Sequence, residues 1–410
     1  MSRRRLVSTA AVLAVSGLAL TACSSSSSGG SSSSTSSSMS ESPSMSASAP
    51  AIDAGSFTAD FSVMKQLTDL AAQGSGLVGV LLPDTTTSTR YVQYDAPYLK
   101  QAFEAAGLSA DQFKIDNANG SASTMQTQAE ADINAGASVL LVDPLDPGSG
   151  AAIENAAKDA GVAVIDYDRL VTGGPADRYY VSFDNVKVGT LIGQGFVQCV
   201  QDWGVQSPQV LIMDGDPTDN NATLFAQGYT DVLKTEFDNG TYTKVAEPAG
   251  TWDPQTAATT FEQQLTAHPE INAAITPNDD NANAVISILK SNGVAAKTFP
   301  TTGQDASLPG LQNVLTGYQC GTVYKPIYLE AQAAAALAIY LRAGVTPPDS
   351  LVNSTTTDTT LNADIPSVYT TPIWVTPSNM ADTVVKDGAV TVADLCAGDV
   401  AQACTDAGIS

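Results

Sequence analysis

The stretch VIDYDR, residues 164–169, closes a short apolar run that begins at residue 162 and ends in a cluster of charged side chains. A run that is apolar throughout, rather than alternating, is typical of a strand covered on both faces of its sheet. Similar runs lie at residues 77–82, 138–142, 209–213, 272–276 and 298–302. Longer stretches with helical periodicity separate them, so the sequence predicts βαβ units with parallel sheets, which is an α/β fold.

Five further polar signatures accompany the predicted strands. In chain order they are YVSFDN (180–185), DPTDNN (216–221), ITPNDD (275–280), TTGQD (301–305) and VYKP (323–326). Ligands of parallel sheets bind beyond the carboxyl ends of the strands, and most of these signatures lie there. Each signature supplies a carboxylate, an amide or a cation. A ligand covered in hydroxyl groups needs many such partners at once, whereas catalysis would need only two or three.

Composition limits the classes of function. A chain of 410 residues is long enough for two domains with full cores. Its net charge of −24 would repel phosphate backbones, so we expect no nucleic acid partner. The only histidine is His268, so most zinc sites and any Ser-His-Asp triad would depend on that one residue. We therefore expect no metal, no other cofactor and no catalytic residues.

The N-terminus has the pattern of an export signal. Three arginines at 3–5 precede an apolar stretch at 6–20, which is too short to span a membrane as a stable helix. The sequence LTAC at 20–23 resembles the lipobox of bacterial lipoproteins, in which the cysteine is acylated. We predict a lipoprotein signal peptide over residues 1–22 and lipidation at Cys23. The alternative is an ordinary signal peptide that is cleaved.

Residues 23–56 consist mainly of Ser with Gly, Thr, Ala, Pro and Met. Such a composition has little to bury, so we predict a disordered tether between the lipid anchor and the folded chain. Order is expected to begin near Phe57, where apolar residues start to follow helical spacing.

Four cysteines remain after Cys23, and an exported compartment is oxidising, so the even number favours disulfides over metal or redox chemistry. We predict that Cys396 pairs with Cys404, which closes a short local loop. This pairing leaves Cys199 to bond with Cys320 over a long range, if the geometry permits.

The signatures YDR, FDN, DNN, ND, GQD and YKP, in this order, resemble those of the sugar-binding lipoproteins and periplasmic proteins of ABC transporters. The resemblance is closest to the D-xylose-binding proteins and their multi-sugar relatives, and it covers roughly residues 76–390. It implies the type I periplasmic binding protein fold. In that fold, two Rossmann-like domains with parallel sheets are joined by a three-strand hinge and close on a sugar.

Mapped onto this chain, the resemblance implies an N-terminal sugar-binding lobe of residues 57–181 and 323–345. The C-terminal lobe would comprise residues 182–322. Residues 346–410 would form a tail that returns across the hinge, and the segment VYTTPIWVTP at 368–377 resembles the last strand of the family.

The resemblance also implies the residues that bind the ligand. They are Arg90, Tyr91, Asp168, Arg169, Asp184, Asn185, Asn220, Trp252, Asn278, Asp305 and Lys325. Carboxylates, amides and a forked guanidinium each satisfy one or two sugar hydroxyls, and an indole face suits the C–H groups of the ring. Tyr91 stands where the close relatives carry Trp. The sequence leaves open which of Asn220 and Asn221 faces the cleft, and Asp or Asn at strand ends could instead cap helices.

The function implied is that of the substrate-binding component of a sugar ABC importer. The protein would be a monomer that is lipid-anchored at the extracellular face of the bacterial cytoplasmic membrane, binds a monosaccharide such as D-xylose or a similar pyranose, and docks on the permease subunits. A sensory binding protein that presents the sugar to a chemoreceptor or sensor kinase remains open. A LacI-type regulator would need a basic helix-turn-helix before residue 60, which the chain lacks. An enzyme with paired carboxylates is the third alternative.

Overall fold

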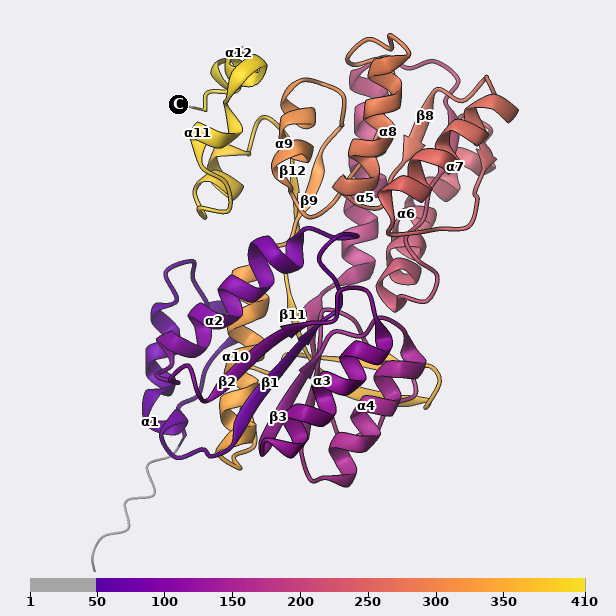
Figure 1. Cartoon of the computed structure of the whole chain (residues 1–410). Helices are drawn as coiled ribbons and strands as arrows, with labels where there is room; N and C mark the ends of the chain where they lie inside the picture. The colour runs from indigo at the N-terminus through magenta and orange to yellow at the C-terminus, as the bar shows by residue number, and fades with distance from the viewer. Residues whose placement is uncertain (1–48, 410) are drawn as a thin grey trace, which may run out of the picture. The chain divides into compact units, whose positions relative to one another are not determined.

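The computed structural model describes residues 49–409 (Figure 1). The predicted signal peptide, Cys23 and the tether up to residue 48 lie outside the described residues. Among residues 49–409, no helix is both long enough and apolar enough to span a membrane.

The predicted start of order near Phe57 is too late, because residues 49–56 already pack against the folded chain. Ile52 is buried, and its backbone N donates a hydrogen bond to Tyr340 Oη at 3.4 Å. Ala54 N donates to Ser350 O at 3.0 Å and begins the short 3-10 helix η1 (Ala54–Ser56). Tertiary contacts with distant residues therefore order a segment whose composition alone predicts disorder.

The larger sheet has seven strands in the order β10-β11-β5-β4-β3-β1-β2. The strands are β1 (Leu77–Leu82), β2 (Phe113–Asn117), β3 (Ala137–Val142), β4 (Ala163–Tyr167), β5 (Tyr179–Phe183), β10 (Ser354–Asp358) and β11 (Ala363–Thr370). All pairings are parallel except that of β10 with β11, which is antiparallel. Strand β5 includes residues 182 and 183, so the expected lobe boundary between residues 181 and 182 falls inside a strand.

Helices cover both faces of this sheet, and we call the whole layered unit the first lobe (Figure 1). Its helices are α1 (Thr68–Ala71), α2 (Ala96–Ala105), α3 (Ala122–Asn134), α4 (Pro147–Asp159) and α10 (Ile327–Arg342), with the short helices η2 (Ser62–Leu67) and η3 (Tyr91–Asp95). Val80 and Leu82 pack in one cluster with α2 and α10, while Leu81 packs on the opposite face with α3 and α4. Burial on both faces explains why the strand sequences are continuously apolar.

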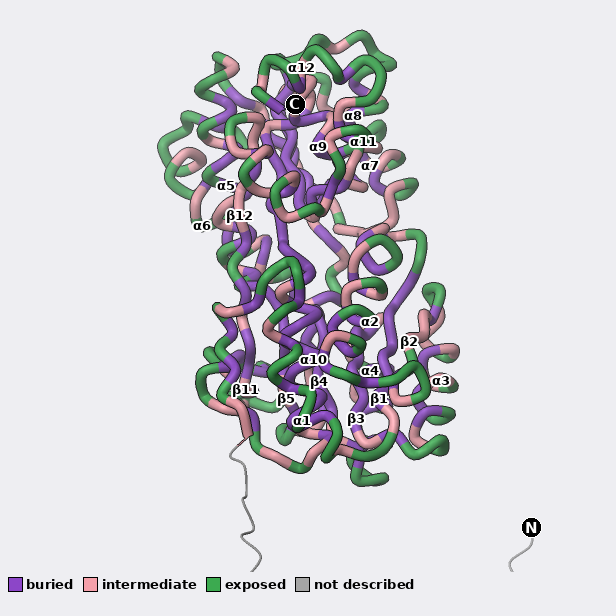
Figure 2. The backbone as a smooth tube through the Cα atoms, turned by 90° about the vertical axis from the view of Figure 1, so that its left-hand side faces the viewer, coloured by how far each residue is buried: buried purple, intermediate pink, exposed green. Residues whose placement is uncertain are grey.

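Helix α10 is buried around almost its whole circumference (Figure 2). Its alanine-rich sequence keeps the side chains small, so the helix packs closely against the sheet. Tyr328 and Glu330 lie near the start of this helix, at the end of the lobe where polar side chains gather.

The second lobe contains a three-stranded parallel sheet in the order β7-β6-β8. Its elements are β6 (Gln209–Ile212), β7 (Thr243–Ala246), β8 (Ala273–Ile275), α5 (Asn185–Asp202), α6 (Asn220–Asp238), α7 (Pro254–Ala267), α8 (Asp279–Ser291) and α9 (Leu308–Leu315). Ile212 packs with α5 and α6, whereas Leu211 packs with α7 and α8 on the other face. This lobe therefore repeats the layered arrangement of the first.

The prediction of a strand at residues 298–302 is wrong. The segment lies beside β8, where Ala274 N donates to Pro300 O at 2.9 Å, but Pro300 has no N–H to return. At the next position, Thr276 N donates to the side-chain oxygen of Thr302 at 3.0 Å instead of to a carbonyl. A proline and a threonine side chain thus replace the regular backbone ladder.

Three crossings connect the lobes. They run from β5 to α5, from β9 (Thr322–Tyr324) to α10, and from β11 to β12 (Ile373–Val375), which pairs antiparallel with β9. The remaining elements are η4 (Ala381–Val385), α11 (Val392–Leu395), η5 (Gly398–Val400) and α12 (Ala401–Asp406), which pack with α9 and β9 in one apolar cluster. The C-terminal tail is therefore divided, with its first part in the large sheet and its last part on the second lobe.

Both predicted disulfides are present. Cys199 on α5 bonds to Cys320 just before β9, with a sequence separation of 121 residues. Cys396 bonds to Cys404 with a separation of 8 residues.

Candidate ligand-binding site

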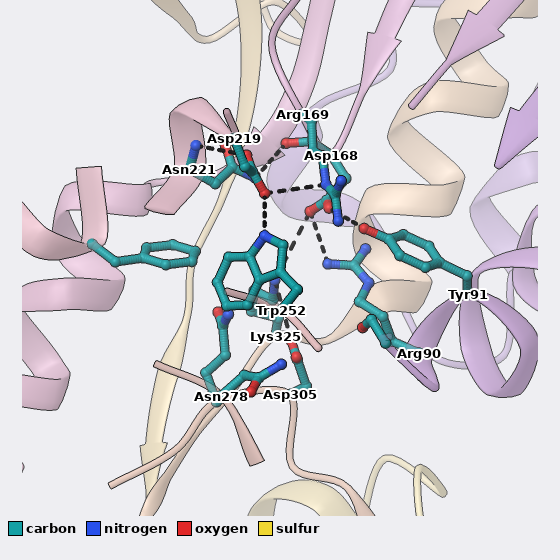
Figure 3. Close-up of a pocket in the computed structure, with 13 residues that line it drawn as sticks. Arg90, Tyr91, Asp168, Arg169, Asp219, Asn221, Trp252, Asn278, Asp305 and Lys325 are labelled. Carbon is teal, nitrogen blue, oxygen red and sulfur yellow. Dashed lines mark hydrogen bonds and ion pairs between the residues drawn. The ribbon is translucent and has the colours of Figure 1, made fainter. Parts of the chain in front are cut away.

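A pocket of about 290 Å³ lies between the polar ends of the two lobes (Figure 3). The first lobe supplies Ser88, Arg90, Tyr91, Asp168 and Arg169, the second lobe supplies Asp219, Asn221, Phe225, Trp252, Asn278, Gln304 and Asp305, and the β9-to-α10 crossing supplies Lys325. These residues follow the carboxyl ends of strands, which is where ligands of parallel sheets bind.

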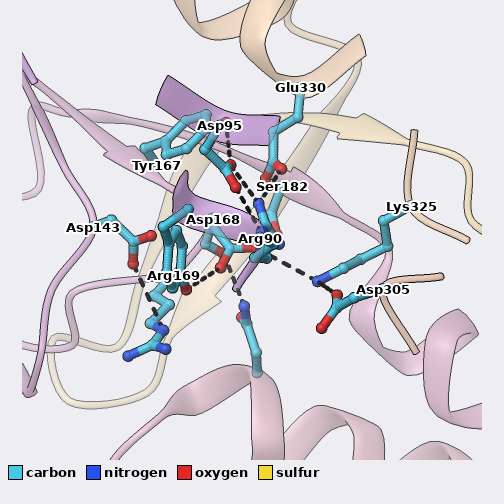
Figure 4. Close-up of polar contacts among 12 residues, drawn as sticks. Arg90, Asp95, Asp143, Tyr167, Asp168, Arg169, Ser182, Asp305, Lys325 and Glu330 are labelled. Carbon is cyan, nitrogen blue, oxygen red and sulfur yellow. Dashed lines mark hydrogen bonds and ion pairs between the residues drawn. The ribbon is translucent and has the colours of Figure 1, made fainter. Parts of the chain in front are cut away.

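Arg90 is the centre of a buried ion network (Figure 4). Its Nε and Nη2 donate to the two carboxylate oxygens of Asp95 at 2.9 and 2.7 Å, and Nη2 also donates to Glu330 Oε2 at 2.9 Å. Nη1 donates to Asp168 Oδ1 at 2.8 Å. A guanidinium has five N–H donors, and four are used in these bonds. One Nη1–H therefore remains for a ligand.

Asp168 connects this network to the pocket. Besides Arg90, it accepts a hydrogen bond from Tyr91 Oη at 3.1 Å, and Lys325 Nζ lies 3.8 Å away. Burial alone would raise the pKa of Asp168, but the charges of Arg90, Lys325 and Arg169 outweigh burial and lower it to about 2. Its backbone has a φ of +59°, a left-handed conformation that aspartate tolerates better than most residues. Asp168 is therefore a fixed, ionised acceptor.

Arg169 points to the second lobe and does not pair with Asp168. Its Nε lies 3.1 Å from Asp219 Oδ2, and the same oxygen accepts a hydrogen bond from Trp252 Nε1 at 3.0 Å. Asp219 also caps helix α6 by accepting from Asn221 N at 2.9 Å. The Trp252 ring packs edge-on against Phe225 at 6.4 Å, which places two aromatic rings at the pocket. Such rings suit the C–H groups of a sugar.

The remaining polar groups come from the opposite side. Lys325 Nζ lies 3.2 Å from Asp305 Oδ1, and the backbone of Asp305 has a φ of +89°. Gln304 is buried, and its Oε1 has no hydrogen-bond partner among the described residues. Asn278 caps α8 with its side-chain oxygen, so the cap does not use its two amide N–H donors. The pocket thus offers both donors and acceptors.

The charges that line the pocket balance. Three cations stand against the three carboxylates of Asp168, Asp219 and Asp305. Three further carboxyl groups lie behind the pocket. Asp95 pairs with Arg90, whereas burial raises the pKa of Asp143 and of Glu330 well above its usual range, which favours their neutral forms. A neutral ligand with many hydroxyl groups fits this balance better than an anion or a cation.

Eight of the expected ligand-binding residues line the pocket, and three do not. Asp184 is exposed and caps α5 by accepting from Lys187 N at 2.9 Å. Asn185 is buried beside the pocket, where its amide donates to Asn221 Oδ1 at 2.9 Å. Asn220 occupies the first position of α6 and does not line the pocket, whereas Asn221 does. Residues of this type commonly cap helices or hold neighbouring side chains, and Asp184 and Asn185 do so here.

Four lining residues were missed, and a fifth, Asn221, was left open beside Asn220. Asp219 and Gln304 lie inside the signatures DPTDNN and TTGQD, which indicate the region of the site but not the exact positions. Ser88 and Phe225 carry no comparable signal, because a lone serine in a loop and a phenylalanine at helical spacing are ordinary features of a fold.

A buried carboxyl beside the pocket predicts a pH dependence of stability. Asp279 accepts hydrogen bonds from Gln319 Nε2 and Ser307 N, both at 2.8 Å, but burial outweighs them and raises its pKa to about 8. In an unfolded chain such a carboxyl titrates near 3.9. Between these values only the folded protein holds the proton, so the free energy of unfolding falls by about 1.4 kcal/mol per pH unit from this group as pH rises.

We therefore expect the stability of Asp279→Asn relative to wild type to increase steadily from pH 5 to pH 8. Urea unfolding at four pH values in this range would measure the difference. The exposed Asp238→Asn is the control, for which the difference should stay constant. A constant difference for Asp279→Asn as well would contradict the raised pKa.

Comparison with known proteins identifies the family of this chain. The model of the family described as "Periplasmic binding protein domain" matches residues 78–345. The D-xylose-binding periplasmic protein of Escherichia coli is 38% identical over 293 residues, which cover 70% of this chain and 83% of that protein. The multiple sugar-binding periplasmic receptor ChvE of Rhizobium radiobacter is 30% identical over 331 residues, 77% of this chain and 91% of that one.

A solved structure has the same architecture. The solute-binding protein of an ABC transporter from Clostridium phytofermentans, with bound β-D-glucose, matches with a TM-score of 0.70 and 27% identity. The match covers 78% of this chain and 99% of that one. The last part of the chain, from residue 346, lies beyond the residues matched by the family model.

Proposed function

Since this chain belongs to the family of periplasmic binding protein domains, we propose that it is the substrate-binding component of a sugar ABC importer. Its ligand would be a monosaccharide, D-xylose or a similar pyranose, held by the residues that line the pocket between the lobes. The proposal requires no bond chemistry, and the permease subunits would be its partner in transport. The relative that binds D-xylose is 38% identical, which supports the choice of a pentose as first candidate.

The observation that carries the proposal is the composition of the pocket. It combines balanced charges, unused donors on Arg90 and Asn278, an unpaired oxygen on Gln304 and two aromatic rings. Each sugar hydroxyl is both a donor and an acceptor, and the ring presents apolar C–H groups, so this mixture matches a sugar in every respect.

Contacts between the lobes support closure around the ligand. Asn221 Nδ2 donates to Asp168 O at 2.9 Å, and Thr89 N donates to Asp280 Oδ2 at 3.3 Å on another side of the pocket. A sugar that touches both lobes adds to the same set of contacts. Its binding therefore favours the closed state, which is the state a permease would recognise.

Calorimetry of the protein from residue 24 onwards against D-xylose, D-glucose and myo-inositol tests the proposal. We expect at least one to bind with a micromolar or lower dissociation constant, because many charge-assisted hydrogen bonds form in a dry pocket. If none of a wider set of monosaccharides binds more tightly than 1 mM, the proposal is wrong.

A substitution at Gly215 tests how strongly sugar affinity depends on the position of Trp252. A Cβ built on Gly215 would overlap the Trp252 ring, so we expect Gly215→Ala to push the ring and its hydrogen bond to Asp219 out of place. Overpacking of this kind costs about 1–3 kcal/mol, and we expect sugar affinity to fall at least tenfold. Gly148→Ala is the control, because its Cβ would meet only the Asp146 side chain. An unchanged affinity in Gly215→Ala would show that Trp252 does not contact the sugar.

A sensory role is the second candidate. The relative from Rhizobium radiobacter is called a receptor, which favours it. Uptake of radiolabelled sugar in cells with and without the gene separates the two. Loss of uptake supports transport, whereas unchanged uptake with a lost response to the sugar supports sensing.

We also propose that acylated Cys23 holds the protein at the extracellular face of the cytoplasmic membrane. Two or more acyl chains bind a bilayer far more firmly than one. Wild-type protein should sediment with membranes, and Cys23→Ala should not. Equal sedimentation of both would contradict the anchor.

A further inference from the structure

Arg169 lies between two carboxylates, one from each lobe. Its Nε is 3.1 Å from Asp219 Oδ2 of the second lobe and 3.6 Å from Asp143 Oδ1 of the first lobe. Figure 3 shows the pair with Asp219, and Figure 4 shows the Asp143 carboxylate beside the same guanidinium. Since Asn221 Nδ2 joins the lobes by donating to Asp168 O at 2.9 Å, Asp219 is the closer partner in a state where the lobes are in contact.

Two further contacts of the Arg169 side chain come from the first lobe. Its Nη1 donates to Pro144 O at 3.3 Å, and its guanidinium carbon lies 5.7 Å from the centre of the Tyr91 ring. Asp143 belongs to the same lobe, because it directly follows β3. When the lobes part, Asp219 therefore moves away with the second lobe, whereas Arg169 stays beside Asp143.

The two carboxylates differ in how much they depend on Arg169. Asp219 accepts hydrogen bonds from Trp252 Nε1 at 3.0 Å and from Asn221 N at 2.9 Å, both within the second lobe. Asp143 is fully buried, and neither of its oxygens has a hydrogen-bond partner among residues 49–409. A buried carboxylate that lacks hydrogen bonds and a close cation binds a proton instead. Asp143 therefore needs either Arg169 or a proton.

The other charged and titratable neighbours of Asp143 do not replace Arg169. They are Arg90, Tyr91 and Asp95 around η3 and Asp168 after β4. Arg90 is already paired with three other carboxylates, and the negative charges of Asp95 and Asp168 oppose ionisation of Asp143. Burial in these surroundings raises the pKa of Asp143 well above its usual range.

We propose that Arg169 exchanges carboxylates when the lobes close on a sugar, from Asp143 in the open protein to Asp219 in the closed protein, and that Asp143 then takes up a proton from water. Asp143 is thus a positioning residue, which holds Arg169 in place while the site is empty. The inference rests on the proposed sugar-binding function and adds a coupling to pH. Because the closed protein holds one more proton than the open protein, sugar binds less tightly as pH rises.

Calorimetry of sugar binding at pH 7 in phosphate, imidazole and Tris counts the protons. The slope of the binding enthalpy against the ionisation enthalpy of the buffer gives the number taken up per sugar. We expect about one proton for wild type, and a dissociation constant that rises by up to about tenfold per pH unit between pH 6 and pH 8.

Asp143→Asn should take up no proton and bind sugar with an affinity that is constant over this pH range. The amide is neutral, as is the protonated carboxyl of the closed protein. The variant should therefore bind more tightly than wild type at pH 8, an effect that loss of a merely structural residue would not produce. Circular dichroism checks that it is folded.

Asp219→Asn removes the other partner and provides a second test. Arg169 should then stay with Asp143 on closure, so that proton uptake falls to about zero and affinity falls as well. Asp146→Asn is the matched control in the same loop as Asp143, because asparagine caps α4 as well as aspartate does. It should keep the proton uptake of wild type.

Three results would overturn the exchange while the proposed function stands. Sugar binds to wild type without proton uptake, Asp143→Asn or Asp219→Asn takes up as many protons as wild type, or a folded Asp143→Asn binds more weakly than wild type at every pH. If no sugar binds at all, both the function and the exchange are overturned.

Discussion

We expect Asp168→Asn to lower the affinity for the sugar that binds wild type by at least about a hundredfold. The change removes the charge that faces Arg90 Nη1 at 2.8 Å and Lys325 Nζ at 3.8 Å, and it turns one acceptor oxygen into a donor. Truncating one partner of a buried, hydrogen-bonded charge pair at a binding site typically costs about 2–5 kcal/mol of binding free energy. The loss should appear mainly as weaker binding, since Arg90 keeps Asp95 and Glu330.

Titration calorimetry gives the affinity, and far-ultraviolet circular dichroism checks that the variant is folded. Asp184→Asn is the matched control, because the same substitution is made outside the pocket and asparagine is as good a helix cap as aspartate. Its affinity should equal that of wild type. A folded Asp168→Asn that binds within threefold of wild type would mean that VIDYDR serves only the structure.

The second large effect concerns stability and the two disulfides. We expect loss of the bridge between Cys199 and Cys320, in the double alanine variant, to lower the free energy of unfolding by about 5 kcal/mol. The same change at Cys396 and Cys404 should cost only about 2.5 kcal/mol. The difference follows from the loops that the bridges close, which separate the cysteines by 121 and 8 residues. A longer loop takes more conformational freedom from the unfolded chain.

Urea unfolding of the two double variants under oxidising conditions compares the losses directly. The variant without the long bridge should unfold at the lower urea concentration, and its sugar affinity should stay close to that of wild type, because neither cysteine lines the site pocket. Equal losses in the two variants would contradict the loop-entropy explanation and point to local packing at the bridges instead.

Much of the fold could be predicted because burial on both faces leaves a direct trace in sequence. The runs at 77–82, 138–142, 162–166, 209–213 and 272–276 coincide with β1, β3, β4, β6 and β8. The prediction failed at 298–302, where the sequence TFPTT is less apolar than the other runs, although residues 299–302 are buried. Hydrophobicity reports burial, whereas a strand also needs free backbone donors, and Pro300 and the Thr302 side chain interrupt them.

The site was predictable by type and region but not by exact position. Asn220 and Asn221 are neighbours of the same chemistry, and the helical phase of α6 turns only the second one to the pocket. Likewise, Asp184 and Asp219 both cap helices, but only Asp219 also reaches Trp252 and Arg169. Such differences depend on where each helix begins relative to the opposite lobe, and no local pattern encodes that.

The sequence by itself determined the α/β class, the even number of cysteines that favours disulfides and the polar character of the strand ends, because these depend on residue type and order along the chain. Only the tertiary structure decided which side chains meet. Arg90 binds Asp95, Asp168 and Glu330 from three separate elements, and Lys325 pairs with Asp305 of the second lobe. The physical reason is that hydrogen bonds and ion pairs act over about 3 Å, a distance set by how distant segments pack.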